Sequence, residues 1–161
     1  MKIQKPQKIS QEILIPIEKF PENINEDEIT GRIFENSMIE KLYLERISIE
    51  KCIFSQCELI ESNFERVSFS DCLLQNCNFS NGTFENCNFV RCQFENCKIT
   101  GGNFVESRLY HVSFNSCNLN YANLSLASFE NVAFLNSVMR ASNFQENHWK
   151  NMEFDKTDLK R

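Results

Sequence analysis

Eight cysteines are the residues of this chain with the clearest capacity for chemistry, and their spacing is regular. In the segment CNFSNGTFENCNFVRCQFENC, which runs from Cys77 to Cys97, successive cysteines are five or ten residues apart. Thiolates bind zinc or iron–sulfur clusters, form disulfides and act as nucleophiles. Structural zinc sites, however, typically use C-x2–4-C pairs whose side chains converge on one point. The C-x4-C spacing here is set by a regular repeat, and ladders of parallel side chains do not converge on one point, so we expect neither a metal centre nor another cofactor.

The cysteines belong to a five-residue repeat that runs through most of the chain. All 27 positions ending in 4 or 9, from Ile29 to Leu159, are apolar, and 14 of the 15 phenylalanines occupy them. Two residues before each of these central positions lies a second restricted position. From residue 52 to residue 142 it holds only small side chains, and it includes all eight cysteines. We therefore interpret the cysteines as small, weakly polar residues that fill a tight inward slot.

A period of five fits neither an α-helix nor a continuous strand. In an α-helix, a five-residue period would spiral the central residues around the helix axis. In a strand, side chains alternate between the two faces every two residues, so a period of five does not keep the central residues on one face. A short extended piece followed by a corner places the central residue and the small residue on one side. The other three positions are mostly Asn, Ser, Glu, Lys, Arg and Gln, and they face water. Such a coil buries its inward residues only by stacking on copies of itself, which predicts an all-β solenoid.

Two segments, YANLSLASFENVAF (residues 121–134) and ASNFQENHW (residues 141–149), carry a family resemblance. They resemble the pentapeptide-repeat family, whose pattern is often written A(D/N)Lxx. The resemblance covers about residues 29–159. It implies a right-handed, four-sided parallel β-helix with four pentapeptides per coil, hence about seven coils. We predict an N-terminal capping segment over residues 1–28 and the β-helix over residues 29–161.

In such a β-helix, residues twenty apart lie above one another. The expected core consists of Phe54, Phe64, Phe69, Phe79, Phe84, Phe89, Phe94, Phe104, Phe114, Phe129, Phe134 and Phe144, with Cys52, Cys57, Cys72, Cys77, Cys87, Cys92, Cys97 and Cys117. Stacked Cβ atoms would be about 4.8 Å apart, beyond the usual disulfide distance, so we expect free, buried thiols. Side-chain amides could also bond one another along the column of Asn63, Asn103, Asn123 and Asn143.

The N-terminal segment lies outside the repeat and is rich in isoleucine and leucine between residues 9 and 17. The ends of a repeat rod would aggregate if left bare, so this segment is expected to act as a cap. Ile33, Ile53 and Leu73 form an apolar stripe at a normally polar position. We hypothesise that the segment packs across this stripe.

Nothing in the sequence indicates an enzyme. His111 and His148 fall at outward positions, and the chain has no glycine-rich phosphate loop, triad motif or HExxH motif. No apolar run approaches the roughly 20 residues of a membrane span, and the start lacks the apolar core of a signal peptide. We therefore expect a non-enzymatic, cytosolic protein that binds no membrane. A net charge of −5 also argues against direct binding of nucleic acid.

Two functions remain open. One is an interaction rod or scaffold whose protein partner is unknown. The other comes only from the resemblance, because quinolone-resistance members of the family bind the type II topoisomerases DNA gyrase or topoisomerase IV with an acidic rod that resembles duplex DNA. A continuous negative stripe would favour the DNA mimic, and alternating charges would favour the scaffold. The candidate partner surface comprises Glu45, Glu65, Glu85, Glu106, Tyr110, Tyr121 and Leu126.

The C-terminal coil has no segment in the sequence that would cap it. Its apolar residues form a candidate dimer edge, namely Trp149, Met152, Phe154 and Leu159. Either the chain is shorter than its relatives, or it hides this edge by end-to-end dimerisation. Of the two we expect the homodimer, in which a two-fold axis pairs the C-terminal coils.

Overall fold

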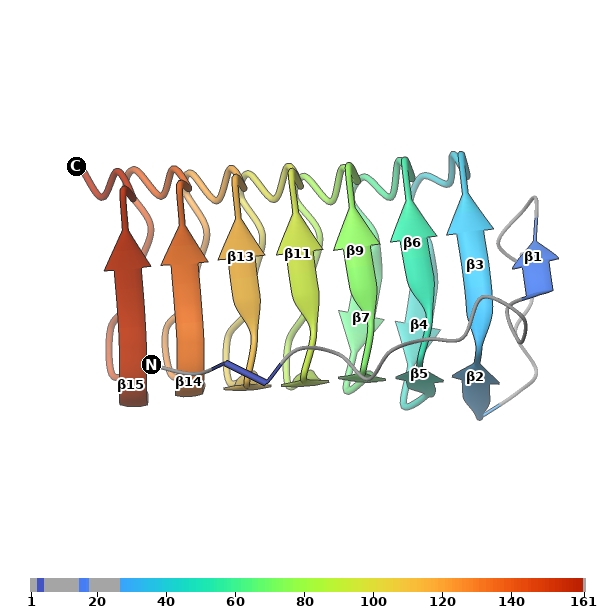
Figure 1. Ribbon diagram of the computed structural model, residues 1–161, viewed down its shortest axis with the longest axis horizontal. Coiled ribbons are helices and arrows are strands. Elements are labelled where there is room, and N and C mark those ends of the chain that lie inside the picture. The colour runs from blue at the N-terminus through green and yellow to red at the C-terminus, as the bar shows by residue number, and fades with distance from the viewer. Residues whose placement is uncertain (1–2, 5–14, 18–26, 161) are drawn as a thin grey trace.

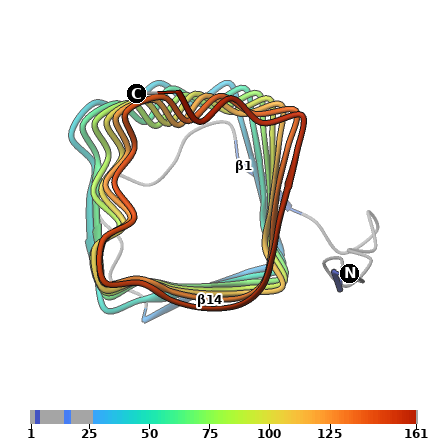
Figure 2. The same cartoon turned by 90° about the vertical axis from the view of Figure 1, so that its left-hand side faces the viewer.

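The chain folds into a rod of stacked coils (Figure 1). The computed structural model describes residues 3–4, 15–17 and 27–160. Parallel pairing joins residues twenty apart, such as Phe94 with Phe114 and Phe114 with Phe134. Seen along the axis, the backbone traces a square (Figure 2). Six turns separate Ile29 from Trp149, so the predicted four-sided parallel solenoid of about seven coils is confirmed in its architecture and close in its length.

Two of the four sides form one continuous parallel sheet of thirteen strands. Face 1 contains β2 (Glu28–Thr30), β5 (Ser48–Glu50), β8 (Ser68–Ser70), β10 (Asn88–Val90) and β12 (Arg108–Tyr110). Face 2 contains β3 (Arg32–Glu35), β6 (Ile53–Ser55), β9 (Leu73–Gln75), β11 (Gln93–Glu95) and β13 (Ser113–Asn115). The last two strands turn the corner and serve both faces; they are β14 (Ser128–Leu135) and β15 (His148–Asp155). No helix in the described residues is long and apolar enough to span a bilayer.

Faces 3 and 4 are joined mostly by single bridges. On face 4, β4 (Tyr43–Glu45) pairs with β7 (Asn63–Glu65), and bridges continue the column up to Asn143. The side chains of Asn103, Asn123 and Asn143 each accept a hydrogen bond from the backbone N–H two residues later, at 3.2, 3.2 and 3.0 Å. These asparagines therefore fix the local turn rather than bonding one another, because the backbone donor of their own coil is within reach.

Each side of the square ends in a left-handed corner residue. The 26 positions from 31 to 156 at steps of five all have φ between 48° and 68°, and only two of them are glycine. Asn, which tolerates this conformation well, occupies eight. None is Val, Ile or Thr, whose branched Cβ atoms clash there. One pentapeptide is thus three extended residues, a left-handed corner and a small inward residue.

Stacked phenylalanines and small residues fill the interior. Phe84 lies with its ring centroid 5.1 Å from that of Phe64 and 4.7 Å from that of Phe104. All the residues of the expected core are buried except Phe144, which is half-buried. Phe144 is the last residue of its column, so no further ring stacks on it. The core was therefore predicted correctly with this one exception.

Many of the small residues in the inward slot also carry a hydrogen-bond donor. Seven of the eight thiols lie within hydrogen-bond reach of the carbonyl 23 residues earlier, as Cys57 Sγ does with Phe34 O at 3.3 Å. Ser137 Oγ donates in the same way to Phe114 O at 3.2 Å. A carbonyl oxygen can accept two hydrogen bonds, so cysteine and serine offer it a contact that alanine of similar size cannot.

At the N-terminal end, β1 (Ile15–Ile17) adds to face 2 in parallel with β3. This pairing covers the edge of the sheet, as expected of a cap, while the predicted boundary at residue 28 stays a prediction. Ile33, Ile53 and Leu73 are each half-buried. The remaining part of the segment that we expected to cover them lies outside the described residues.

Candidate functional site

The cysteines are placed for packing rather than for reaction. All eight are free and buried. Burial raises the pKa of Cys52 to about 11 and that of Cys87 to about 12. A hydrogen bond with Cys117, reinforced by burial, raises the pKa of Cys97 to about 12. Thiols in this state stay protonated, so they are poor nucleophiles and poor metal ligands. The described residues contain no group of three or more metal-binding side chains.

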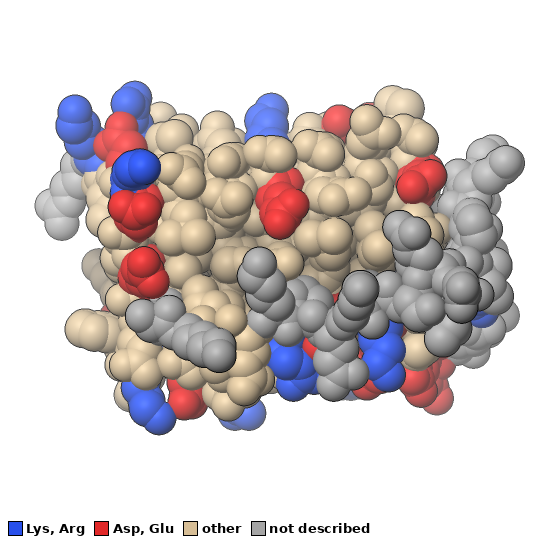
Figure 3. Space-filling view, in the orientation of Figure 1, with Lys and Arg blue, Asp and Glu red and all other residues tan. Residues whose placement is uncertain are grey.

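The acidic candidates are interrupted by basic and uncharged residues. Glu45 and Glu65 lie one above the other on face 4. Glu45 is 3.2 Å from Arg46 and 3.7 Å from Arg66, which also lies 2.9 Å from Glu65. In Figure 3, acidic and basic side chains are likewise scattered among uncharged ones. Where the structure describes them, face 4 and the side of the rod seen in Figure 3 thus carry mixed charges rather than a continuous negative stripe.

The remaining candidates for the partner surface lie on different sides of the rod. Glu85 continues the column of Glu45 and accepts a hydrogen bond from Asn103 at 2.6 Å. Glu106 and Leu126 lie at the corner between faces 4 and 1, Tyr121 at the corner between faces 3 and 4, and Tyr110 on face 1. All four are exposed. The structure therefore does not assemble the predicted residues into one surface.

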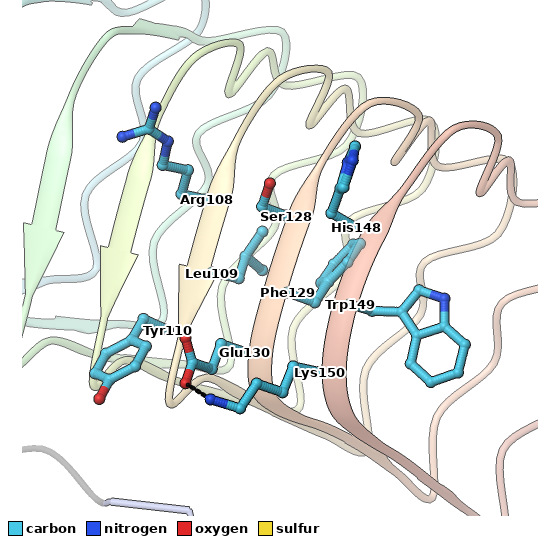
Figure 4. A pocket seen from close by; sticks show the side chains of 9 residues that line it. All are labelled: Arg108, Leu109, Tyr110, Ser128, Phe129, Glu130, His148, Trp149 and Lys150. Carbon is cyan, nitrogen blue, oxygen red and sulfur yellow. Dashed lines mark hydrogen bonds and ion pairs between the residues drawn. The ribbon is translucent and has the colours of Figure 1, made fainter.

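A hollow of about 400 Å³ lies on face 1 over β12, β14 and β15 (Figure 4). Two outward columns border it, and the backbone of the central residues forms its floor. The residues that line it are Arg108, Leu109, Tyr110, Ser128, Phe129, Glu130, His148, Trp149 and Lys150. Within it, Lys150 Nζ lies 2.9 Å from Glu130 Oε1.

Sequence reasoning found only Tyr110 and Trp149 in this hollow. Arg108, His148 and Lys150 were missed as candidate binding residues, although all three are exposed. Their positions were readable from the twenty-residue spacing, because residues 108, 128 and 148 must form one column and residues 110, 130 and 150 the next.

A second hollow, of about 570 Å³, opens at the C-terminal end of the rod. Phe144, Met152 and Phe154 line it together with Trp149, whose ring points past the last coil (Figure 4). Trp149 is 68% exposed, Phe154 42% and Leu159 48%, whereas Met152 is half-buried. Within the described residues β15 pairs only with β14, so its outer edge is open. The candidate dimer edge is thus both apolar and unpaired.

Comparison with known families agrees with this geometry. The model of the pentapeptide repeat region matches residues 87–161, and that of pentapeptide repeats in eight copies matches residues 52–91. Together they cover about two thirds of the chain. The chain belongs to the pentapeptide-repeat family.

Solved pentapeptide-repeat structures resemble this one only remotely. QnrB1, a plasmid-mediated fluoroquinolone resistance protein, is 15% identical over 86% of this chain and 92% of its own, with a TM-score of 0.46. Rfr23 from the cyanobacterium Cyanothece 51142 is 17% identical over 83% and 91%, also with 0.46. A thylakoid-lumen protein from Arabidopsis thaliana is 12% identical over 66% and 71%, with 0.33. No curated protein sequence matches significantly. Likeness at this level carries no argument about function.

Proposed function

We propose that this pentapeptide-repeat protein is a non-enzymatic interaction rod that presents the C-terminal half of face 1 to a protein partner. The observation that carries the proposal is the hollow on face 1 that Arg108 and Tyr110 border together with the ion pair of Glu130 and Lys150. Both Arg108 and Tyr110 are exposed, and Tyr and Arg are among the residues that most often dominate binding energy at protein interfaces. The hollow between them is large enough to receive a side chain of the partner.

The arrangement of charges gives less support to a DNA mimic that binds a type II topoisomerase. Six acidic residues of the described part of the chain form ion pairs with Lys or Arg. Duplex DNA presents regularly spaced, unpaired negative charges. Alternating charges favour the scaffold, so we place the mimic second.

A second copy of the chain is the proposed occupant of the C-terminal end. At the other end, β1 already covers the edge of face 2, so a head-to-tail contact would have to displace it. Two identical C-terminal ends meet without that cost about a two-fold axis. We also propose a cytosolic location, because eight free thiols fit a reducing compartment.

Affinity capture from a lysate of the source cells tests the partner surface. We expect the wild-type rod to retain a protein that the double variant Arg108→Glu, Tyr110→Ala loses. Lys98→Glu, an exposed charge reversal on face 3, is the matched control and should retain it. Equal retention by the double variant would contradict the proposed surface. Inhibition of gyrase supercoiling by the rod, or protection of gyrase from a fluoroquinolone, would instead place the mimic first. The double variant Glu45→Gln, Glu65→Gln should then lose that effect.

Light scattering tests the dimer. The wild-type protein should have a mass in solution twice that of the 18.9 kDa chain. The double variant Trp149→Ser, Phe154→Asp should have the mass of a single chain. Tyr43→Ser removes an exposed aromatic residue on β4, near the opposite end of the rod, and should leave the dimer intact. A wild-type monomer at high micromolar concentration would refute the pairing of C-terminal coils.

A further inference from the structure

Two rows of outward side chains border the hollow on face 1, and they project in opposite directions from its floor (Figure 4). The first, here called the donor row, consists of Arg108, Ser128 and His148, and the second of Tyr110, Glu130 and Lys150. In the second row Lys150 Nζ lies 2.9 Å from Glu130 Oε1, so the charge of that carboxylate is already balanced. The donor row has no carboxylate of its own, so the two walls of the hollow differ in chemistry.

The donor row carries hydrogen-bond donors that are not in use. Four of the six arginines among the described residues form ion pairs, and Arg108 is not one of them. Within the described part of the chain, the side chains of Ser128 and His148 likewise have no hydrogen-bond partner. A guanidinium offers several N–H donors and no acceptor, a hydroxyl offers one O–H, and a neutral imidazole offers one N–H. An acceptor that enters this row from outside can therefore be bonded by all three side chains.

The short side chain of Ser128 leaves a notch in the middle of the donor row. Its neighbours in the coils on either side, Arg108 and His148, are longer and exposed, whereas Ser128 is half-buried. The backbones of the two outer residues lie two coil spacings, about 10 Å, apart. A carboxylate group fits between their side chains, with the serine hydroxyl at the base of the notch. The planar fork of a guanidinium also matches the two oxygens of a carboxylate.

The corner residues beside the donor row limit the charge that the notch can hold. Glu106 and Glu146, which lie two residues before the outer members of the row, are both exposed. In the middle coil the corner residue is Leu126, so no glutamate occupies the corner beside Ser128. Arg108 balances the single charge of a carboxylate, whereas the second charge of a phosphate group would be repelled by both glutamates. The notch therefore suits an aspartate or glutamate better than a phosphorylated side chain.

We propose that the protein partner docks an aspartate or glutamate side chain in this notch, with its carboxylate between Arg108 and His148 and over the hydroxyl of Ser128. The proposal rests on the proposed function and adds the chemistry of the partner to it. Tyr110, 40% exposed on the opposite row, offers its ring to an apolar residue of the same partner segment. The acid is required, because a partner that covers Arg108 without bonding it leaves a desolvated charge unpaired.

Selection from a random peptide library on the full chain tests the proposal. The peptides are displayed by fusion at their C-terminus, so that side chains supply their only carboxylates. Removing every peptide that also binds the Tyr110→Ala variant retains peptides that use face 1 and favours neither sign of charge. We expect the retained peptides to share one Asp or Glu close to an apolar residue.

A double-mutant cycle on one retained peptide, made with an amidated C-terminus and followed by fluorescence anisotropy, is decisive. Arg108→Gln should weaken binding at least tenfold, and so should replacing the shared acid of the peptide by its amide. Against Arg108→Gln the same amide replacement should weaken binding less than twofold, because the contact is already lost. Lys98→Gln, which removes an exposed cation on face 3, is the control and should bind as the wild type does. Circular dichroism shows whether each variant keeps the β-helix.

The outcomes separate this inference from the proposed function. Retained peptides without a shared acid, or an acid whose loss weakens binding equally in the wild type and in Arg108→Gln, would overturn the inference and leave the partner surface standing. Tighter binding of a peptide with phosphoserine in place of the acid would overturn the choice of a carboxylate. If no peptide depends on Tyr110, the partner surface is refuted and the inference falls with it.

Discussion

The buried thiols should make the rod unfold sharply at alkaline pH. Six cysteines have a raised pKa, namely Cys52, Cys57, Cys72, Cys77, Cys87 and Cys97. In Cys72 and Cys87 the main cause is burial, which disfavours the charged thiolate. In Cys77 a hydrogen bond with Cys57 lowers the pKa, but one with Cys97 and burial outweigh it and raise it to about 12.

The direction follows from where each state holds its protons. An unfolded thiol loses its proton near pH 8.5, whereas the folded thiols keep theirs to about pH 11 or beyond. Between these values the folded state binds more protons, so stability falls as pH rises. Below about pH 8.5 the contribution of the thiols is complete, and it is lost progressively toward the folded pKa values.

The loss should be steep because six groups act together. Each thiol that ionises only in the unfolded state lowers the free energy of unfolding by about 1.36 kcal/mol per pH unit. Six of them give a limiting slope of about 8 kcal/mol per pH unit. A domain with an ordinary stability of about 5–15 kcal/mol would therefore unfold between about pH 9 and 10.5.

Urea unfolding, followed by circular dichroism from pH 7.5 to 10 under a reductant, measures the slope. Cys72→Val and Cys87→Ala each replace one of the six thiols by a residue that the fold already holds at an equivalent position, because Val132 and Ala127 occupy the same slots in higher coils. The double variant should lose about a third of the slope while staying folded at neutral pH. An unchanged slope would refute the reasoning, as would rapid reaction of the native thiols with a disulfide reagent at pH 8.

Two further predictions concern the core and the corners. Phe84→Ala should lower the free energy of unfolding by about 4 kcal/mol, since Phe84 is fully buried between two stacked rings. Phe154→Ala, at a residue 42% exposed, should cost less than half as much in the same urea titration. Lys51 is exposed with φ of 52°, so Lys51→Gly should gain about 0.5–1 kcal/mol and Lys51→Val should lose about 1–2. A thermal melt in which Lys51→Val matches the wild type would contradict the corner argument.

The interior was predictable because its packing dictates residue type at fixed positions. Phe94, Phe114 and Phe134 stack as the twenty-residue spacing required, with centroids 4.6 and 5.0 Å apart. The corner rule was equally visible, as the absence of Val, Ile and Thr from 26 positions, but it was not recognised. The turns made by asparagine were missed for another reason: stacking argues for contacts between coils, whereas Asn123 bonds the backbone of its own coil.

The surface was less predictable because its residues are not required to pack. The period assigns Leu126 and Tyr121 to the outside, but two apolar residues five apart lie on neighbouring corners rather than in one patch. Grouping requires the twenty-residue register, which places Arg108, Ser128 and His148 in one column. Even then, the register does not say which of the outward columns a partner contacts.

Departures from the repeat are therefore the most informative residues of this rod. An outward residue that is buried marks a place where other side chains or backbone lie over it, and Asp71 and His111 mark the corner between faces 1 and 2 in this way. An inward residue that is exposed marks a place where a neighbour is missing, and Trp149 and Phe154 mark the C-terminal end. The first kind points to a contact within the chain, and the second to a contact with another molecule that can form. Dilution separates the two kinds of contact, because a dimer depends on protein concentration whereas a contact within one chain does not.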